Sequence, residues 1–258
     1  MDRTGIRHAA AALAALLLLA AGVRDSRGLV FDFEDLQHGE IALGTRGILD
    51  ISAHNPNRSF DLAVGFDSRL TGTRDPDLEA GPGGWSGGNL AGADLGVLLV
   101  LQENSIGCGD GICDAPDDEG RRPAGELVFR FSTPVRDFRF DAVDIEGVMA
   151  ERASITFYDG TRQATLDLLD FLDPGSPFYD PSLVFGDRTA NRFPTIRAQD
   201  LGLPEIDRIV FAMGGSGALD NLTVTPVPEP STALILGLGL AVLAQRRRCA
   251  AEGRPPRT

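Results

Sequence analysis

Lysine is absent from this chain of 258 residues, and histidine, cysteine and tryptophan are scarce. The absence of lysine reflects genome composition and does not bear on function. Only His38 and His54 follow the N-terminal apolar segment, and neither has the spacing of a metal ligand. The segment around Ser216 lacks the second glycine of a nucleophile elbow. We therefore predict that the protein is not an enzyme.

Long hydrophobic runs are also lacking. The apolar runs at residues 9–21 and 233–244 are about a dozen residues long, whereas about 20 are needed to cross a bilayer core comfortably. Arg3 and Arg7 precede the first run, which is the pattern of a secretory signal peptide. We expect this signal peptide at residues 1–22, with cleavage after Gly22.

The second run belongs to an ordered C-terminal pattern. Its parts are Val227, Pro228, Glu229 and Pro230, then the apolar run, then Arg246, Arg247 and Arg248. The two prolines should end the folded domain and allow a helix only after Pro230. Arginines beside a hydrophobic segment are typical of the cytoplasmic side of a membrane. A buried core helix is the alternative, but such a helix would rarely end in three consecutive arginines.

This tail resembles the PEP-CTERM sorting signal of Gram-negative bacteria. The resemblance implies that the apolar run is a short transmembrane helix in the inner membrane, and that an exosortase recognises and cleaves the tail. It also implies that the protein then reaches the cell surface or the extracellular matrix, usually in species that make exopolysaccharide. We therefore expect a folded domain at residues 23–225 and a sorting signal at residues 226–258.

The charge of the chain limits its partners. The net charge is −13, from 24 basic and 37 acidic residues. A nucleic-acid-binding protein needs a basic face, so we expect no nucleic acid partner. Such an acidic surface suits solubility outside the cell and divalent cations.

The three cysteines divide between the domain and the tail. Cys249 lies in the segment that processing would remove, whereas Cys108 and Cys113 are separated by four residues in a glycine-bearing loop. In an oxidising compartment we expect these two to form a disulfide. A zinc site would require more Cys or His nearby.

From residue 28 onward, short runs of β-forming residues alternate with clusters of Gly, Pro, Asn and Asp. The expected strands are residues 29–34, 47–53, 60–66, 97–102, 126–131, 138–145, 153–158, 164–169, 208–212 and 219–225. About ten short strands without an amphipathic helix predict a single all-β domain, a jelly-roll-like β-sandwich. Residues 163–172 stay open between strand and helix, because Leu168, Phe171 and Leu172 also fit a helical face.

Acidic residues stand on the first and the last expected strands. They are Asp32, Glu34 and Asp35 on the first strand, and Asp220 with Asn221 on the last. This pairing resembles extracellular jelly-roll modules of the carbohydrate-binding and MAM-like kind. The resemblance implies one structural calcium ion held by Glu34 and Asp220, with Asn221 as a further ligand. The alternative is an ordinary strand edge, where Asp220 and Asn221 support a turn.

The long loop at residues 67–96 offers other candidates. Asp75 and Asp77 give alternating carboxylates, which are either a second possible calcium site or a solvated acidic loop. Trp85 is the only tryptophan. Its ring could stack on a sugar as a glycan contact, or it could be a hydrophobic plug that pins the loop to the sheet.

These observations predict an exported surface or matrix protein with a non-catalytic structural or adhesive role, stabilised by calcium. Its expected partners are an exosortase and, before processing, the inner membrane. A second hypothesis is a carbohydrate-binding module for exopolysaccharide that uses Trp85. A third is a glycosidase, which would need a carboxylate pair, and the sequence does not locate one.

Overall fold

Twelve strands and four 3-10 helices make up the part of the chain that this computed structural model describes, residues 28–146 and 153–228. The strands are β1 (Leu29–Phe31), β2 (Gly44–Arg46), β3 (Leu49–His54), β4 (Ala63–Asp67), β5 (Val97–Leu101), β6 (Gly125–Val143), β7 (Ser154–Asp159), β8 (Arg162–Asp167), β9 (Ala190–Arg192), β10 (Ile196–Arg197), β11 (Ile206–Met213) and β12 (Ala218–Pro226). The 3-10 helices are η1 (Pro76–Leu78), η2 (Cys108–Asp110), η3 (Leu168–Phe171) and η4 (Ala198–Leu201).

Strand β6 organises the domain because its two halves pair with different strands. Its first half, up to Phe131, lies between β3 and β11. Its second half, from Val135, lies between β12 and the short strands β9 and β10. Pro134, which cannot donate a ladder hydrogen bond, falls between the two halves. The chain therefore passes from one layer to the other within a single strand.

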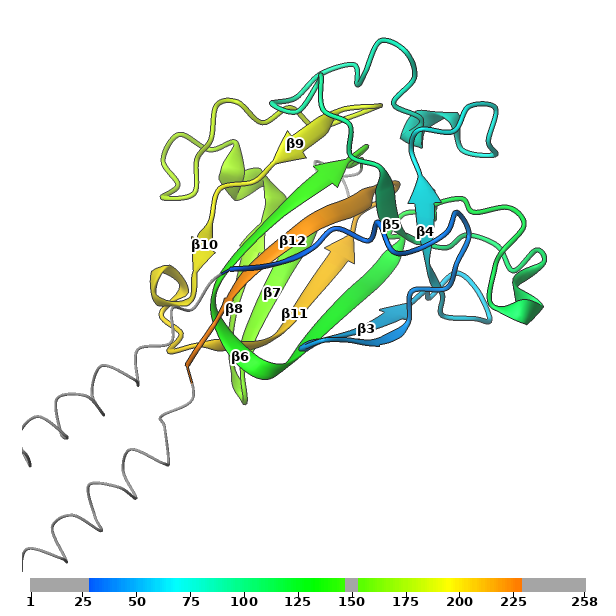
Figure 1. The fold of residues 1–258 in the computed structure, drawn as a ribbon. Helices are drawn as coiled ribbons and strands as arrows, with labels where there is room; N and C mark the ends of the chain where they lie inside the picture. The colour runs from blue at the N-terminus through cyan, green and yellow to red at the C-terminus, as the bar shows by residue number, and fades with distance from the viewer. Residues whose placement is uncertain (1–27, 147–152, 229–258) are drawn as a thin grey trace, which may run out of the picture. The chain divides into compact units, whose positions relative to one another are not determined.

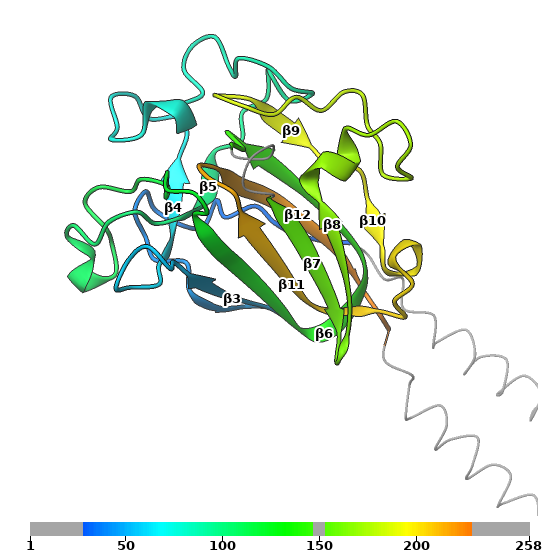
Figure 2. The same ribbon diagram turned by 180° about the vertical axis from the view of Figure 1, so that it is seen from behind.

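The remaining strands complete the two layers. One layer runs in the order β2, β3, β6, β11, β7 and β8, and the other contains β4, β5, β12 and β6, with β1 paired to β12. Because β6 belongs to both, the strands form one antiparallel sheet that curls over itself. Figure 1 views it from the side of β1, β5 and β12, and Figure 2 from the side of β11, β7 and β8.

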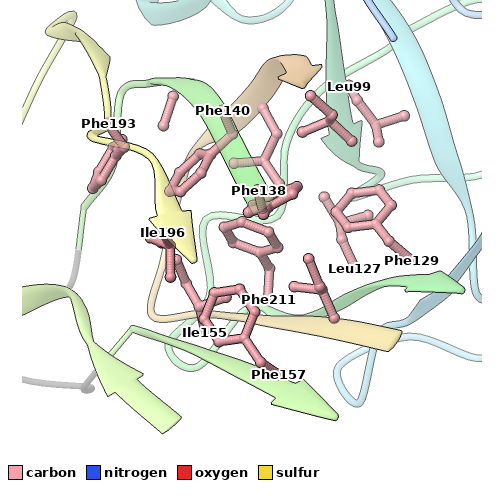
Figure 3. Packing of buried hydrophobic residues seen from close by; sticks show 14 of the residues in the cluster. Leu99, Leu127, Phe129, Phe138, Phe140, Ile155, Phe157, Phe193, Ile196 and Phe211 are labelled. Carbon is pink, nitrogen blue, oxygen red and sulfur yellow. The ribbon is translucent and has the colours of Figure 1, made fainter. Parts of the chain in front are cut away.

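Phenylalanines fill the space between the layers. Phe129, Phe138 and Phe140 on β6, Phe157 on β7 and Phe211 on β11 are all buried, and they converge in Figure 3. The rings of Phe140 and Phe211 meet edge to face with their centroids 4.9 Å apart, a geometry that aromatic pairs favour. Burial of one such side chain contributes about 1.5–3 kcal/mol. Alternate residues of each strand point inward, so the period-two pattern fixes which face meets the core.

A second apolar cluster covers the other face of β5. Leu99 and Leu101 belong to the main core, whereas Leu98 and Val100 belong to the second cluster, together with Trp85 from the preceding loop. Strand β5 is thus buried on both faces, which explains why its five residues are all apolar.

The prediction of an all-β domain is confirmed. Two strands expected as separate, residues 126–131 and 138–145, are the two halves of β6, because the ladder continues on either side of Pro134. The structure also contains β2, β9 and β10, which are only two or three residues long and carry too few residues for a periodic pattern. Residues 163–172 divide between the two alternatives, since β8 ends at Asp167 and η3 follows it.

The terminal segments fall outside the described residues. These include the expected signal peptide, residues 1–22, and the sorting-motif residues Glu229, Pro230, Arg246, Arg247 and Arg248. Val227 and Pro228 are described, and the backbone N–H of Val227 donates to the carbonyl of Pro134 at 2.8 Å. Within the ranges described, no helix is both long and apolar enough to cross a membrane.

Candidate functional site

An open acidic cavity lies where the first and last strands of the domain meet. Its volume is about 260 Å³, and it is lined by Asp32, Glu34, Arg69, Asp94, Leu95, Gly96, Asp220 and Asn221. Strand β1 pairs with β12 (Figure 1), so the residues that follow β1 come beside the bulged part of β12. The structure therefore places Glu34, Asp220 and Asn221, the three residues predicted for calcium, around one cavity.

Asp220 is the buried carboxylate of this cavity and is only 1 % exposed. Its Oδ2 atom accepts a hydrogen bond from the side-chain amide of Asn221 at 2.7 Å. Its Oδ1 atom is buried and has no hydrogen-bond partner among the described residues. Burial, together with the negative charges of Asp141, Glu34 and Asp32, raises the pKa of Asp220 to about 8. One buried oxygen is thus left for a proton or a cation.

Asp141, close to Asp220, is equally buried but fully paired. The Arg192 guanidinium donates to both of its carboxylate oxygens, from Nε at 2.8 Å and from Nη2 at 2.7 Å. The side-chain amide of Asn221 also donates to Asp141, at 3.0 Å. A two-pronged arginine pair of this kind satisfies a buried carboxylate. The unpaired oxygen of Asp220 is therefore a local exception to a well-satisfied network.

Glu34 reaches the cavity from the segment after β1. Its Oε1 atom accepts from the backbone N–H of Val97 at 2.8 Å, and its Oε2 atom accepts from Arg69 at 3.2 Å. Gly96 makes this approach possible: its φ is +61°, and a Cβ atom there would lie 1.7 Å from Oε1 of Glu34. Glu34 is thereby held at the start of β5, with Arg69 as the neighbouring cation.

The backbone of β12 is irregular at the site. Its register with β6 shifts between Asp220 and Thr223, and Asn221 has a φ of 50°. Asparagine tolerates this left-handed region better than most residues do. A bulge interrupts the regular alternation of side chains, and here two consecutive residues, Asp220 and Asn221, line the same cavity.

The donor set of the cavity suits a hard cation such as calcium, which prefers carboxylate and carbonyl oxygens. The unpartnered buried oxygen of Asp220 fits such an ion. The outer carboxylates would have to move toward it, because no three His, Cys, Asp or Glu side chains in the described ranges are grouped closely enough to hold a metal as they stand. Arg69 supplies a positive charge at the same place.

The alternative pair, Asp75 and Asp77, is divided between a buried and an exposed side chain. Asp75 is buried and caps η1, with one oxygen accepting from the backbone N–H of Asp77 at 3.2 Å. Its other oxygen accepts from the backbone N–H of Asp118 at 3.4 Å. The side chain of Asp77 is exposed. The carboxylate of Asp75 thus serves the loop backbone.

The structure also contains a buried acidic cluster that the sequence did not reveal, made of Asp75, Asp118 and Asp144. Asp118 accepts from the backbone N–H of Gly217 at 2.6 Å, and Asp144 accepts from that of Arg188 at 2.6 Å. Burial raises the pKa of Asp118 well above its usual range, with added repulsion from Asp75. Burial likewise raises the pKa of Asp144 to about 8. Asp144 lies within the expected strand at residues 138–145, and nothing in its local pattern marks it as buried.

The two remaining predictions concern Trp85, in the loop between β4 and β5, and the cysteine pair, in the loop between β5 and β6. Trp85 is 4 % exposed, and its indole N–H donates to the carbonyl of Ala93 at 3.2 Å. Of the two alternatives for Trp85, the buried ring fits the hydrophobic plug. A glycan contact would require a ring that is exposed to solvent. Cys108 and Cys113 are joined by a disulfide, which closes the loop that contains η2.

Comparison with known proteins identifies the tail. The family described as "PEP-CTERM protein-sorting motif" matches residues 226–248, which confirms the resemblance inferred from the sequence. No curated protein matches the chain. Carriage of this motif indicates export across the inner membrane and a cell-surface or extracellular location after processing by an exosortase.

Solved structures give a distant likeness for the folded domain. The K2 cleaved adhesin domain of Lys-gingipain is 12 % identical, with a TM-score of 0.37, and the match covers 77 % of this chain and 99 % of that one. The K1 cleaved adhesin domain of Lys-gingipain from Porphyromonas gingivalis W83 is 10 % identical, with a TM-score of 0.35, and the match covers 78 % and 99 %. Both TM-scores are below 0.5, so neither likeness indicates a function.

Proposed function

We propose that this chain is a surface-sorted protein with a non-catalytic structural or adhesive role in the cell envelope or its exopolysaccharide matrix. The observation that carries the proposal is the position of the sorting motif relative to the fold. The motif begins at residue 226, and β12 ends at Pro226. Cleavage within the tail would therefore leave every strand of the domain intact and release a complete module.

The sorting step is tested by replacing Glu229 with alanine and fractionating the cells. Exosortase recognition depends on the Pro-Glu-Pro element in this proposal, so the Glu229→Ala protein should stay uncleaved in the membrane fraction. Glu252→Ala is the matched control, because Glu252 lies in the tail beyond the matched residues, and it should be processed normally. Release of Glu229→Ala at the mass of the processed wild-type protein would count against the proposal.

We further propose that the acidic cavity binds one calcium ion that stabilises the domain. Asp220, Glu34 and Asn221 would hold it, with Asp32 and Asp94 available at the rim. The support is the buried, unpartnered Oδ1 of Asp220 within a cavity lined by further carboxylates. Calcium would neutralise a buried charge whose ionisation is otherwise disfavoured.

Thermal unfolding of the compact unit Gly28–Val227 tests the calcium site. An ion that binds only the folded state stabilises it by about 2.7 kcal/mol when its concentration is 100 times the Kd, so the midpoint should rise in calcium relative to excess chelator. Asp220→Asn should abolish the rise. Asp144→Asn, which alters a buried carboxylate elsewhere, should keep it. The absence of any rise in the wild-type domain, or its persistence in Asp220→Asn, would refute the site.

A further inference from the structure

The layer that contains β3, β6, β11, β7 and β8 carries a row of polar side chains on its outer face, and Figure 2 shows the strands of this layer. The strand registers place Asp50, Arg130, Arg208, Tyr158 and Gln163 opposite one another on β3, β6, β11, β7 and β8. Direct chain neighbours of the row, such as Ile51, Phe129 and Ile209, belong to the main core, so this row faces away from it.

Two arginines stand directly opposite each other in the row. Arg130 pairs in register with Arg208 across β6 and β11, and like charges at opposed positions destabilise a sheet. Arg130 donates to the hydroxyl of Ser52 at 3.0 Å. The guanidinium of Arg208 lies 3.7 Å from the centre of the Tyr158 ring. Neither arginine forms an ion pair with a carboxylate of residues 28–146 or 153–228.

The nearest carboxylates by position are engaged elsewhere. Asp50, opposite Arg130, accepts from the hydroxyl of Thr45 at 3.1 Å. Asp207, next to Arg208 in the chain, accepts from the backbone N–H of Gly160 at 2.7 Å. The chain has 37 acidic residues and a net charge of −13, so two opposed arginines without an ion pair in the described ranges are a local departure from its general character. Their free N–H groups could bind an anion.

The surroundings of the pair define what kind of anion fits. Stacking on an aromatic ring holds the planar guanidinium in one orientation, and its fork of N–H groups matches a carboxylate with two parallel hydrogen bonds. Beside the row, the hydroxyls of Thr156 and Thr165 lie 3.0 Å apart on the same face, and Gln163 is exposed at the end of the row. Such neutral groups can form hydrogen bonds with hydroxyls of a ligand. A ligand that carries both carboxylates and hydroxyls is an acidic sugar.

We propose that Arg130 and Arg208, with Tyr158 as a positioning residue, form a binding site for the carboxylates of an acidic polysaccharide. This site is separate from the acidic cavity and does not involve Trp85. A nucleic acid fits less well, because its phosphates require an extended basic face, and this face contributes two cations to an acidic chain. This site adds a ligand class to the proposed surface role. It rests on that role in one respect, because the protein must reach the surface or the matrix to meet the polysaccharide.

The experiment measures binding of purified Gly28–Val227, which is one compact unit with its own core, to polygalacturonate by isothermal titration. Saturable, salt-sensitive binding is expected, and the neutral glucan dextran should not bind. Arg208→Gln and Arg130→Gln should each weaken affinity about tenfold, the effect of losing a charge-assisted hydrogen bond. Arg121→Gln removes the same charge from an exposed loop position and should leave affinity unchanged.

Three results would overturn the assignment. They are no saturable binding of polygalacturonate, an equal loss in Arg121→Gln, and duplex DNA binding with the same affinity and the same dependence on Arg130 and Arg208. Tyr158→Leu separates positioning from charge, since it should weaken polygalacturonate binding while both arginines remain. Because purified domain is used, a negative result leaves the Glu229 sorting experiment unaffected.

Discussion

At the residue scale, three buried carboxylates govern how the domain responds to pH. Asp118, Asp144 and Asp220 all have pKa values raised by burial. A carboxyl group with a raised pKa binds more protons in the folded state than in the unfolded state. Its contribution to stability is complete below the unfolded pKa, about 4, and is lost as the pH rises through the folded value. Without bound cations, stability should fall between about pH 4 and 8.

Asp144→Asn should flatten this pH dependence. The pKa of Asp144 is about 8, and an asparagine could still accept from Arg188 and tolerate the φ of 55° at this position. The free energy of unfolding in urea with chelator should increase by more than about 1 kcal/mol at pH 8, since one pKa unit corresponds to about 1.4 kcal/mol. At pH 4 the change should be small. Asp200→Asn, at an exposed position, is the control, and an equal gain at both pH values would contradict the assignment.

At the element scale, an ion pair ties the loop after β3 to the loop before β6. Arg58 donates to Glu119 at 2.7 Å and to Glu103 at 2.6 Å. The side chain of Glu119 is fully buried and also accepts from Asn55 at 3.0 Å. Burial by itself would raise the pKa of Glu119, but the hydrogen bonds from Arg58 and Asn55 outweigh burial and lower it. The two loops are thus joined by the buried carboxylate of Glu119, whose negative charge is stabilised by Arg58 and Asn55.

Arg58→Met should destabilise the domain strongly. Removal of one partner leaves Glu119 buried and uncompensated, which typically costs about 3–5 kcal/mol. Arg46→Met is the matched control, because Arg46 pairs with Asp35, whose side chain is 73 % exposed. Loss of a pair with so exposed a partner costs at most about 1 kcal/mol. Urea denaturation at neutral pH compares the two, and similar losses would mean that the buried pair contributes no more than the exposed one.

At the scale of the whole domain, β6 couples the two layers. Both layers lose a strand if β6 detaches, and the second apolar cluster shares β5, β6 and β12 with the main core. We therefore expect a single cooperative unfolding transition of the kind seen in small domains. The loop that carries Trp85 should unfold with the sheet, because its ring packs into that second cluster.

The single tryptophan makes this expectation measurable. Fluorescence of Trp85 reports the loop and the second cluster, whereas far-ultraviolet circular dichroism reports the strands. The two transitions in urea should have the same midpoint. A lower midpoint for Trp85 would show that the loop opens as a separate unit.

Local patterns in the sequence determined the destination of this protein and its class of fold. The PEP-CTERM motif is contiguous, so its residues are recognisable without a structure, and alternating apolar residues marked most strands because the pleat repeats every two residues. Trp85 stayed open between two interpretations, since the sequence does not show what packs on its ring.

Only the tertiary structure decided which distant residues meet. Pairing of β1 with β12 brings Glu34 to the same cavity as Asp220, whose Oδ1 has no hydrogen-bond partner among the described residues. The opposition of Arg130 and Arg208 likewise depends on the register of β6 with β11. Register is set by the whole sheet, and a shift of one residue would turn each of these side chains to the opposite face.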